Sequence, residues 1–385
     1  MVRKKGTTWE ARAYWRDASG NKQSKYHAGF KTKAAAEKWE RDTIAANKHT
    51  TRADAHQVTV NQLYYEWLEK LRDRGRSPST IASYEYDATH FLPLIGCMSV
   101  QEVRRWHVQD VIDKIAVKPN LSPETVRKAA RGLRSLFSYG VENGVIDISP
   151  FIKINLPESH PKPLRKYTPV QVNELISGLR RQFHIIYVII VFCLLYGLRR
   201  GEACGIRWCD IDWDSGIVTV RGSISMAKTD IYYGPTKTRQ SSDTIVLTPW
   251  FLEDLRQIRR ERFANGTLHI PNITAVTTHV PINDVNPYQF VSLDANNNVM
   301  RPDGIPGRLR RFQKANNLPI TSIKDLRKNY GTLLKESGAD IATISKALRH
   351  SSIKITSDQY IDSTAEIKRQ ATTTMDHLIK IEPGN

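Results

Sequence analysis

The chain has 385 residues, of which 40% are hydrophobic, and a formal net charge of +18. This length predicts two or three domains, and the charge favours a nucleic-acid or anionic-membrane partner. The N-terminal Met1–Lys5 leads into polar residues rather than a signal-peptide core, and the apolar run at 185–198 is too short to span a bilayer. We therefore expect a soluble protein that is not exported, with nucleic acid rather than membrane as its partner.

Positive charge lies at both ends of the chain. Residues 1–57 contain 13 Lys and Arg against 6 Asp and Glu, and residues 151–385 contain 32 against 22. Residues 58–150 are nearly balanced, with 12 against 11. Nucleic-acid binding at both ends explains this distribution, and a merely solvated surface is the alternative.

The cysteines do not predict a metal site. They are Cys97, Cys193, Cys204 and Cys209. Only the last two lie close together, and no second Cys or His pair stands at metal-ligand spacing. We expect buried, reduced thiols, and neither a metal nor another cofactor.

The first fifty residues predict a small sheet backed by one helix. Trp9–Arg16 alternates apolar and polar residues, as a half-buried strand does. Residues 17–21 have turn chemistry, and 22–30 is the returning strand. Thr32 then caps an Ala-rich helix over about 33–46. The candidate DNA contacts of this sheet are Arg12, Tyr14, Arg16 and Lys22. A strand can enter a major groove with such side chains, and a small solvated sheet is the alternative.

Residues 58–149 change to a helical pattern. The expected helices are 60–74, 79–93, 100–116 and 123–142. Their start signals are the capping boxes Thr59–Gln62 and Ser99–Glu102 and the pair Ser122–Pro123, and their stop signals are Gly96 and Gly144. This bundle has no catalytic constellation. Its exposed cations, of which Lys128 and Arg131 are our candidates, are suited to clamping the DNA backbone, and a solvated helix face is the alternative.

A basic, proline-rich linker at 150–166 precedes the last domain. Thr168–Gln171 combines an N-cap, an N1 proline and a capping-box glutamine, and so opens a new helix. Gly216–Ser225 and Thr244–Leu247 have strand character, with a turn expected at Gly234–Pro235 between them. The polar stretch 266–303 is expected to be a surface insertion.

Four short stretches of this domain carry side chains suited to phosphate chemistry. Leu195–Glu202 places Arg199 directly after the apolar helix and a glycine, where a guanidinium can be held rigidly and donate two parallel hydrogen bonds. Lys237 lies in a predicted hairpin turn, from which it can protonate a leaving oxygen. Lys324 and Arg327 share one face of a helix that begins near Ser322. Alone, each has an ordinary structural explanation.

The fourth stretch completes a recognisable order. Leu348–Ile353 contains His350, and Tyr360 follows ten residues later. The order Arg, Lys, Lys-x-x-Arg, His, Tyr resembles the tyrosine recombinase family, as do "GLRRGE", "KDLR" and "LRHSSI". The N-terminal segment resembles the arm-type DNA-binding domain of integrases of phages and integrative elements, and the middle bundle lies where that family has its core-binding domain.

This resemblance implies a multidomain, mainly α protein with small β elements. Its expected domains are an arm-type domain at 1–50 (a three-stranded sheet plus a helix), a four-helix core-binding domain at 58–149, the linker at 150–166, and a mostly helical catalytic domain at 167–385 with a small inserted antiparallel sheet. The implied catalytic residues are Arg199, Lys237, Lys324, Arg327, His350 and Tyr360. Tyr360 is the expected nucleophile, forming a 3′-phosphotyrosine. Glu202 is expected to orient Arg199 or close the turn, and a purely structural role is the alternative.

Two positions depart from the family pattern. Lys324 stands where the family usually has histidine, which leaves a donor and adds a fixed charge. Arg349 stands where the family usually has glycine before His350, and an added phosphate contact is the simplest expectation. Neither change removes the nucleophile.

The resemblance also implies partners. We expect double-stranded attachment-site DNA, a homotetramer on that DNA with exchange of the C-terminal tail, an excisionase, a DNA-bending host protein, and a location in the bacterial cytoplasm with the nucleoid. Packing of the tail against its own domain is the alternative to exchange. The function is then integration and excision of a phage or other mobile element. Two alternatives remain. Ile341–Thr356 has the pattern of a helix-turn-helix, as in a non-catalytic DNA-binding regulator, and a type IB topoisomerase-like enzyme would use the same tyrosine chemistry.

Overall fold

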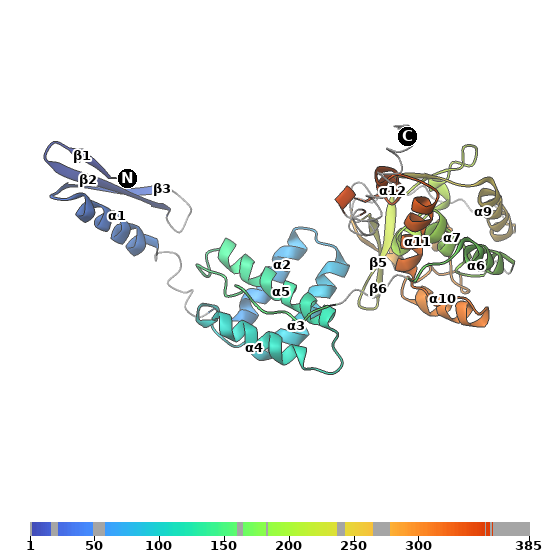
Figure 1. Ribbon diagram of the computed structural model, residues 1–385, viewed down its shortest axis with the longest axis horizontal. Coiled ribbons are helices and arrows are strands. Elements are labelled where there is room, and N and C mark those ends of the chain that lie inside the picture. The colour runs from blue at the N-terminus through green and yellow to red at the C-terminus, as the bar shows by residue number, and fades with distance from the viewer. Residues whose placement is uncertain are drawn as a thin grey trace, which may run out of the picture. The chain divides into compact units, whose positions relative to one another are not determined.

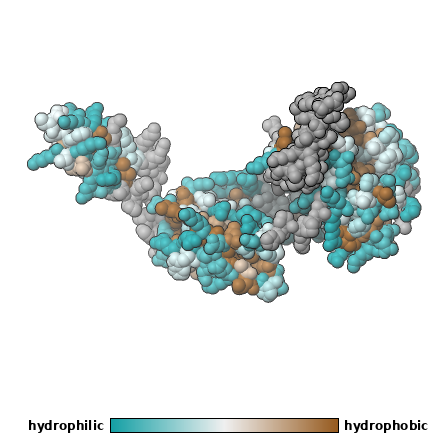
Figure 2. All heavy atoms as spheres, viewed as in Figure 1, coloured by the Kyte–Doolittle hydropathy of each residue, from teal (hydrophilic) through white to brown (hydrophobic). Residues whose placement is uncertain are grey.

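The computed structural model describes residues 2–16, 22–48, 58–159, 165–181, 184–236, 243–264, 278–350, 352–354 and 356. The chain divides into two compact units, Met1–Arg76 with Thr80–His160 and Ser77–Ser79 with Pro161–Asn385. Within the described residues helices predominate and the strands form small antiparallel sheets, which confirms the expected fold class. None of the described helices is long and apolar enough to cross a membrane. Figure 2 shows hydrophilic residues over most of the visible face of both units.

The chain begins with the expected three-stranded sheet and its helix. The elements are β1 (Val2–Lys5), β2 (Thr8–Arg16), β3 (Lys22–Phe30) and α1 (Lys33–Lys48), with the strands antiparallel in that order. The Thr32 hydroxyl accepts a hydrogen bond from the backbone N–H of Ala35 and so caps α1. Ala11, Ala13 and Ala36 are fully buried, so α1 packs on the alanine-bearing face of β2.

The next elements form the helical bundle. They are α2 (Val60–Asp73), α3 (Pro78–Ile95), the short 3₁₀ helix η2 (Val100–Glu102), α4 (Arg105–Ala116) and α5 (Pro123–Glu142). The reciprocal Thr59–Gln62 capping box is present, and the Ser122 side chain accepts from the backbone N–H of Thr125. Both starts were predicted from local sequence.

The predicted helix at 100–116 is wrong at its start. Ser99 makes no side-chain cap bond, and Val103 and Arg104 are extended, so that α4 begins only at Arg105. The reason is tertiary: the backbone around Ser99 pairs with the segment before α2, and the Val100 N–H donates to the carbonyl of Val58 at 2.9 Å.

The second unit is larger and mostly helical. Its helices are α6 (Pro169–Arg181), α7 (Tyr187–Leu195), α8 (Arg200–Cys204), η3 (Trp208–Asp210), α9 (Pro249–Arg262), η5 (Ile282–Asp284), η6 (Pro287–Gln289), α10 (Gly304–Ala315), α11 (Ile323–Glu336) and α12 (Ile341–Ala347). Its strands are β4 (Ile217–Thr219), β5 (Gly222–Ala227), β6 (Asp230–Pro235), β7 (Thr244–Val246) and β8 (Val280–Pro281). The apolar helix α7 is central to this unit and contacts α6, α8 and α11 (Figure 1).

Two small antiparallel sheets, β4–β7 and β5–β6–β8, take the place of the single inserted sheet that was expected. The turn is also not where the sequence pattern placed it. Gly234 and Pro235 lie inside β6, opposite Ser223 and Gly222 of β5. The chain reverses instead at Lys228, which has φ +54°. A Cβ on Gly234 would lie 2.5 Å from the ring of His279, so this glycine allows close packing within the strand rather than a turn.

The predicted surface insertion at 266–303 is wrong where the structure describes it. Phe290, Val291 and Met300 are fully buried and belong to the core of the second unit. Arg262 of α9 donates hydrogen bonds to the carbonyls of Phe290 and Val291, at 3.1 and 2.8 Å. The polar composition of this stretch conceals spaced apolar residues that pack inward. Residues 266–277 of the stretch lie outside the described part.

The prediction for the cysteines is half right. All four are free thiols, and Cys193 and Cys204 are buried in the second unit. Cys97 and Cys209 are exposed: Cys97 lies in the connection between α3 and η2, and Cys209 is the middle residue of η3.

Candidate active site

The backbone around Arg199 is fixed by the elements on either side of it. α7 ends at Leu195, and Gly197 turns the chain with φ +61°. A Cβ on Gly197 would lie 2.6 Å from the Tyr330 ring, so only glycine fits without displacing that ring. Arg199 is then the N-cap of α8.

Glu202 holds Arg199 from within the same turn. The backbone N–H of Arg199 donates to Oε2 of Glu202 at 3.0 Å, and its Nη1 donates to Oε1 at 2.7 Å. The carboxylate therefore closes the turn and also orients the guanidinium, the two roles weighed from the sequence. Burial raises the pKa of Glu202, but Arg349 and Arg199 more than offset this and hold it below its ordinary value.

Lys324 and Arg327 come from the first turns of α11. The Ser322 hydroxyl caps this helix by accepting from the Asp325 N–H at 3.1 Å, and the Asp325 carboxylate accepts from Ser322 in return. Lys324 is exposed and Arg327 is partly buried. Together with Arg199 they line a pocket of about 360 Å³. Its lining residues are Leu198, Arg199, Arg200, Pro306, Ser322, Ile323, Lys324 and Arg327.

The Arg327 side chain ties three segments together. Its Nη1 donates to the carbonyl of Gly197 and its Nη2 to the carbonyl of Leu348. Nη1 also lies 4.0 Å from Oε2 of Glu202. Burial, reinforced by the charge of Arg199, lowers the pKa of Arg327 to about 10, which leaves the group charged at neutral pH.

His350 follows directly on the segment that Arg327 contacts. Its backbone N–H donates to the carbonyl of Ser345, and its Nδ1 lies 2.9 Å from the Thr356 hydroxyl. Burial lowers the pKa of His350 to about 4, and the guanidiniums of Arg327, Arg199 and Arg349 add to this effect. At neutral pH the imidazole is therefore uncharged and able to accept a proton.

The expectation that Arg349 adds a phosphate contact is wrong. Its side chain is 1% exposed, and its Nη2 donates to Oε2 of Glu202 at 2.8 Å. Arg349 also has φ +50°, in the left-handed region, which accounts for glycine at this position in the family pattern. Its guanidinium faces a buried carboxylate rather than the pocket.

The predicted catalytic residues divide into two groups. Arg199, Lys324 and Arg327 line one pocket, and His350 is close enough to be influenced by two of these charges. Lys237 and Tyr360 lie outside the described residues. The sequence reasoning gave no role to Thr356, which is fully buried and contacts His350. The one sequence feature that could have indicated a role for Thr356 is its hydroxyl group, six residues after His350.

The arm-segment candidates lie on the β2 and β3 strands. Tyr14 is 53% exposed, and the Arg12 guanidinium lies over the Tyr26 ring at 5.7 Å. Arg16 and Lys22 are opposite each other in the β2–β3 pairing, and their side chains lie outside the described part. The sheet therefore brings the predicted contacts onto adjacent strands.

The two bundle candidates on α5 have acidic neighbours. The Lys128 ammonium lies 3.8 Å from the buried Asp87 carboxylate, whose pKa is raised by that burial. Arg131 donates to Glu124 at 3.1 Å. Both cations remain about half exposed, as a DNA contact requires.

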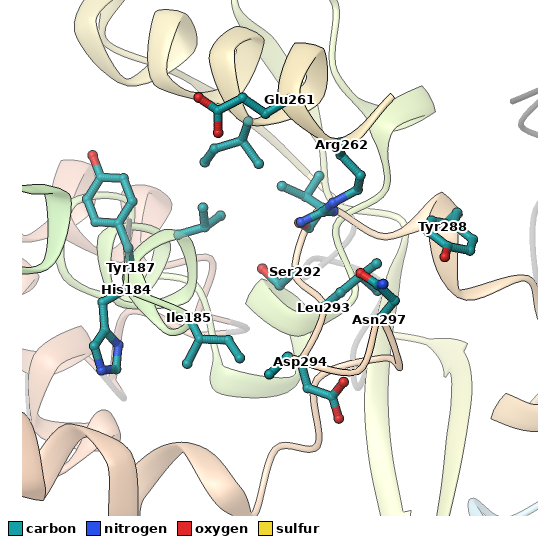
Figure 3. Close-up of a pocket in the computed structure, with 14 residues that line it drawn as sticks. His184, Ile185, Tyr187, Glu261, Arg262, Tyr288, Ser292, Leu293, Asp294 and Asn297 are labelled. Atoms are coloured by element: carbon teal, nitrogen blue, oxygen red, sulfur yellow. The ribbon is translucent and has the colours of Figure 1, made fainter. Parts of the chain in front are cut away.

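A second pocket, of about 510 Å³, lies elsewhere in the same unit (Figure 3). Figure 3 shows Glu261 and Arg262 from the end of α9 at one side of it and Ser292, Asp294 and Asn297 at another. None of the described catalytic candidates lines this pocket. Its larger volume does not make it the candidate active site, because Arg199, Lys324 and Arg327 line the pocket of about 360 Å³ instead.

The fold is that of solved DNA recombinase structures. The Tn1549 transposon integrase in complex with transposon right end DNA matches with a TM-score of 0.65 and 20% identity, over 82% of this chain and 99% of that one. A lambda integrase dimer bound to a COC′ core site matches with a TM-score of 0.55 and 12% identity, over 94% of each chain.

Proteins with similar sequences are named as tyrosine recombinases and integrases. "Tyrosine recombinase XerC-like" from Caldanaerobacter subterraneus subsp. tengcongensis is 23% identical, over 94% of both chains. The "ICEBs1 integrase" of Bacillus subtilis is 21% identical, over 73% of this chain and 72% of that protein.

Three domain families match successive parts of the chain. Residues 1–46 match the Arm DNA-binding domain, and residues 63–147 match the N-terminal SAM-like domain of phage integrases. Residues 166–366, more than half of the chain, match the Phage integrase family. With the pocket of convergent cations in the fold of integrase structures, this match establishes that the chain belongs to the phage integrase family, the tyrosine recombinases.

Proposed function

We propose that this chain is a site-specific recombinase that integrates and excises a mobile DNA element through a 3′-phosphotyrosine at Tyr360. As a member of its family it is a DNA breaking-and-rejoining enzyme. The observation that carries the proposal is the convergence of Arg199, Lys324 and Arg327 on one pocket, with the neutral His350 nearby. Such a cluster fits a single phosphodiester group.

The chemistry follows from these charges. The phenolic oxygen of Tyr360 attacks the phosphorus, forming a Tyr–phosphate bond as the bond to the 5′-oxygen breaks. Arg199 and Arg327 hold the non-bridging oxygens, where negative charge develops. His350 either accepts the phenolic proton or hydrogen-bonds the phosphate while that proton passes to water, and Lys237 protonates the departing 5′-oxygen.

Rejoining reverses each of these steps. A 5′-hydroxyl attacks the phosphotyrosine, Lys237 recovers its proton for the next turnover, and Tyr360 is released. Because the phosphodiester energy is retained in the covalent bond, strand exchange requires no ATP. Lys324 shares the phosphate binding that the family assigns to histidine.

The assembly that we propose follows the solved relatives. The Tn1549 integrase was solved on transposon end DNA, and lambda integrase was solved as a tetramer bound to a Holliday junction. For this chain we propose attachment-site DNA as substrate, a homotetramer with tail exchange, and an excisionase and a DNA-bending protein as accessory factors. We propose the division into an arm domain at 1–50, a core-binding domain at 58–149, a linker at 150–166 and a catalytic domain at 167–385.

A nicked suicide duplex tests this function directly. Duplexes that tile the DNA beside the gene would be incubated with the wild type and with Tyr360→Phe, in EDTA and without ATP, and run on a denaturing gel. A slow-migrating protein–DNA adduct with the wild type only is the expected result. Salt-sensitive binding without any adduct would overturn the proposal in favour of a DNA-binding regulator.

A second assay distinguishes a recombinase from a type IB topoisomerase-like enzyme. It would form the same adduct but relax a supercoiled plasmid that carries no attachment site. A recombinase requires two specific sites and joins their strands, so recombinant product from a plasmid carrying both sites is the expected result.

A further inference from the structure

Arg349 is held in an unfavourable environment. It has φ +50°, which strains a residue with a Cβ, and its side chain is 1% exposed. Its Nη2 donates to Glu202 at 2.8 Å and to the carbonyl of Gly197 at 3.5 Å, while its Nε and Nη1 have no hydrogen-bond partner among the described residues. A buried, partly unsatisfied cation is costly, and glycine would fit this backbone better. The side chain therefore requires an explanation beyond packing.

The carboxylate of Glu202 accepts hydrogen bonds from both Arg199 and Arg349. Its Oε1 accepts from Nη1 of Arg199, and its Oε2 accepts from the backbone N–H of Arg199 and from Arg349. Nη1 of Arg327 lies 4.0 Å from that same Oε2, just beyond hydrogen-bonding distance. A shift of about 1 Å would turn this approach into a direct charged hydrogen bond.

The Arg327 guanidinium is not hydrogen-bonded to Glu202 in the structure. Its two terminal nitrogens donate to the carbonyls of Gly197 and Leu348, and it lines the pocket with Arg199. With Arg349 absent, the buried carboxylate of Glu202 would have one cation fewer, and Arg327 is the nearest replacement. Drawing Arg327 onto Glu202 would remove it from the phosphate-binding position.

We propose that Arg349 is a positioning residue, which occupies Oε2 of Glu202 and thereby keeps Arg327 available to the scissile phosphate. This inference rests on the proposed function for its catalytic consequence. Arg349 contacts no substrate in this role. Its guanidinium is the second cation bonded to the Glu202 carboxylate, beside that of Arg199. Without Arg349, this carboxylate would draw Arg327 out of the pocket.

Arg349→Gly tests the role of the guanidinium without adding backbone strain. Arg349→Gly removes the guanidinium and relieves the backbone, so a loss of activity cannot come from strain at φ +50°. A matched control is Lys153→Gly, which also replaces a cationic residue at a positive φ, of +48°, but at an exposed position in the other unit. Arg349→Lys restores a positive charge at the position and serves as a second variant where the glycine variant folds poorly.

The kinetic test uses single-turnover cleavage of the suicide duplex that yields adduct with the wild type. Arg349→Gly is expected to slow cleavage on the order of tenfold or more, with DNA affinity close to that of the wild type and of Lys153→Gly. Arg349→Lys is expected to recover part of this rate. In a Glu202→Gln background the loss caused by Arg349→Gly is expected to be several-fold smaller, because the competing carboxylate is gone.

A DNA-free test separates this inference from the proposed function. A crystal structure of the unbound Arg349→Gly chain is expected to have Nη1 of Arg327 within hydrogen-bonding distance of Glu202. An unmoved Arg327, or a rate loss from Arg349→Gly that is the same with and without the Glu202→Gln substitution, would overturn the role of Arg349. Failure of the wild type to form any adduct would instead overturn the proposed function, and the crystal structure would still decide the contact.

Discussion

The Oδ1 atom of Asn329 accepts a hydrogen bond from the backbone N–H of Tyr167 at 2.9 Å. Asn329 is 1% exposed, and its Nδ2 donates to the carbonyls of Arg165 and Asp325. One amide thus joins the segment before α6 to α11. Because Asn329 lies two residues after Arg327, this anchor also fixes the helix that presents the guanidinium.

Asn329→Leu is therefore expected to reduce both stability and cleavage. Leucine leaves the buried N–H of Tyr167 unsatisfied, which costs about 1–3 kcal/mol in the free energy of unfolding. Thermal unfolding would measure this loss, with the exposed Glu336→Gln at the end of α11 as the control. A variant as stable as that control would contradict the anchoring role.

His350 is expected to stay neutral over the pH range in which an ordinary histidine titrates. Burial and three nearby guanidiniums lower its pKa to about 4, whereas an unfolded histidine titrates near about 6.5. Histidine ¹³C NMR, with the signal assigned by His350→Gln, should show no titration of this residue between about pH 5.5 and 8. A midpoint near the ordinary value would contradict the burial of the ring beside the arginines.

The same shift has a consequence for stability. Because the folded state binds the His350 proton more weakly than the unfolded state does, stability is retained above the unfolded pKa and falls as the pH drops toward the folded value of about 4. His350→Gln is expected to lose less stability than the wild type on acidification from neutral pH. Parallel pH profiles of thermal unfolding for the two proteins would contradict this.

Much of the architecture could be predicted because its signals are local. The caps at Thr59, Ser122 and Ser322 each involve residues three apart, so the sequence specifies them directly. The start at Ser99 failed because pairing with a distant segment outweighs a local cap. Local signals predict element starts well and fail where tertiary pairing competes.

The site could be predicted only in part for the same reason. The residue types and spacing singled out Arg199, Lys324, Arg327 and His350, and the structure places the first three on one pocket with His350 near two of these charges. The contact between Arg349 and Glu202 spans 147 positions, and no local pattern predicts it. The role expected for Arg349 was wrong because it was inferred from the sequence neighbour His350, a predicted catalytic residue, whereas the spatial neighbour of Arg349 is a buried carboxylate.

Lys324 provides a test of what the departure from the family histidine does. Lys324→His restores the family residue but supplies a positive charge only below about pH 6.5. Cleavage by this variant is expected to decline between about pH 6 and 8 relative to the wild type, while Lys324→Ala is slow at every pH. Single-turnover rates across that range provide the measurement. Equal pH profiles for Lys324→His and the wild type would mean that charge at this position does not contribute to the rate.

The arm segment should be separable from the chemistry. Arg12 lies over the Tyr26 ring on a sheet formed entirely within residues 2–30, and Arg16 is on the same strand. Arg12→Ala with Arg16→Ala is expected to weaken binding to accessory sites, and to lower its salt dependence, because it removes two cations that we propose contact phosphates. Cleavage of a core-site suicide duplex by the same variant is expected to match the wild type. Equal losses in accessory binding and core cleavage would mean that the sheet supports the catalytic domain directly, and that the two ends of the chain do not read separate DNA sites.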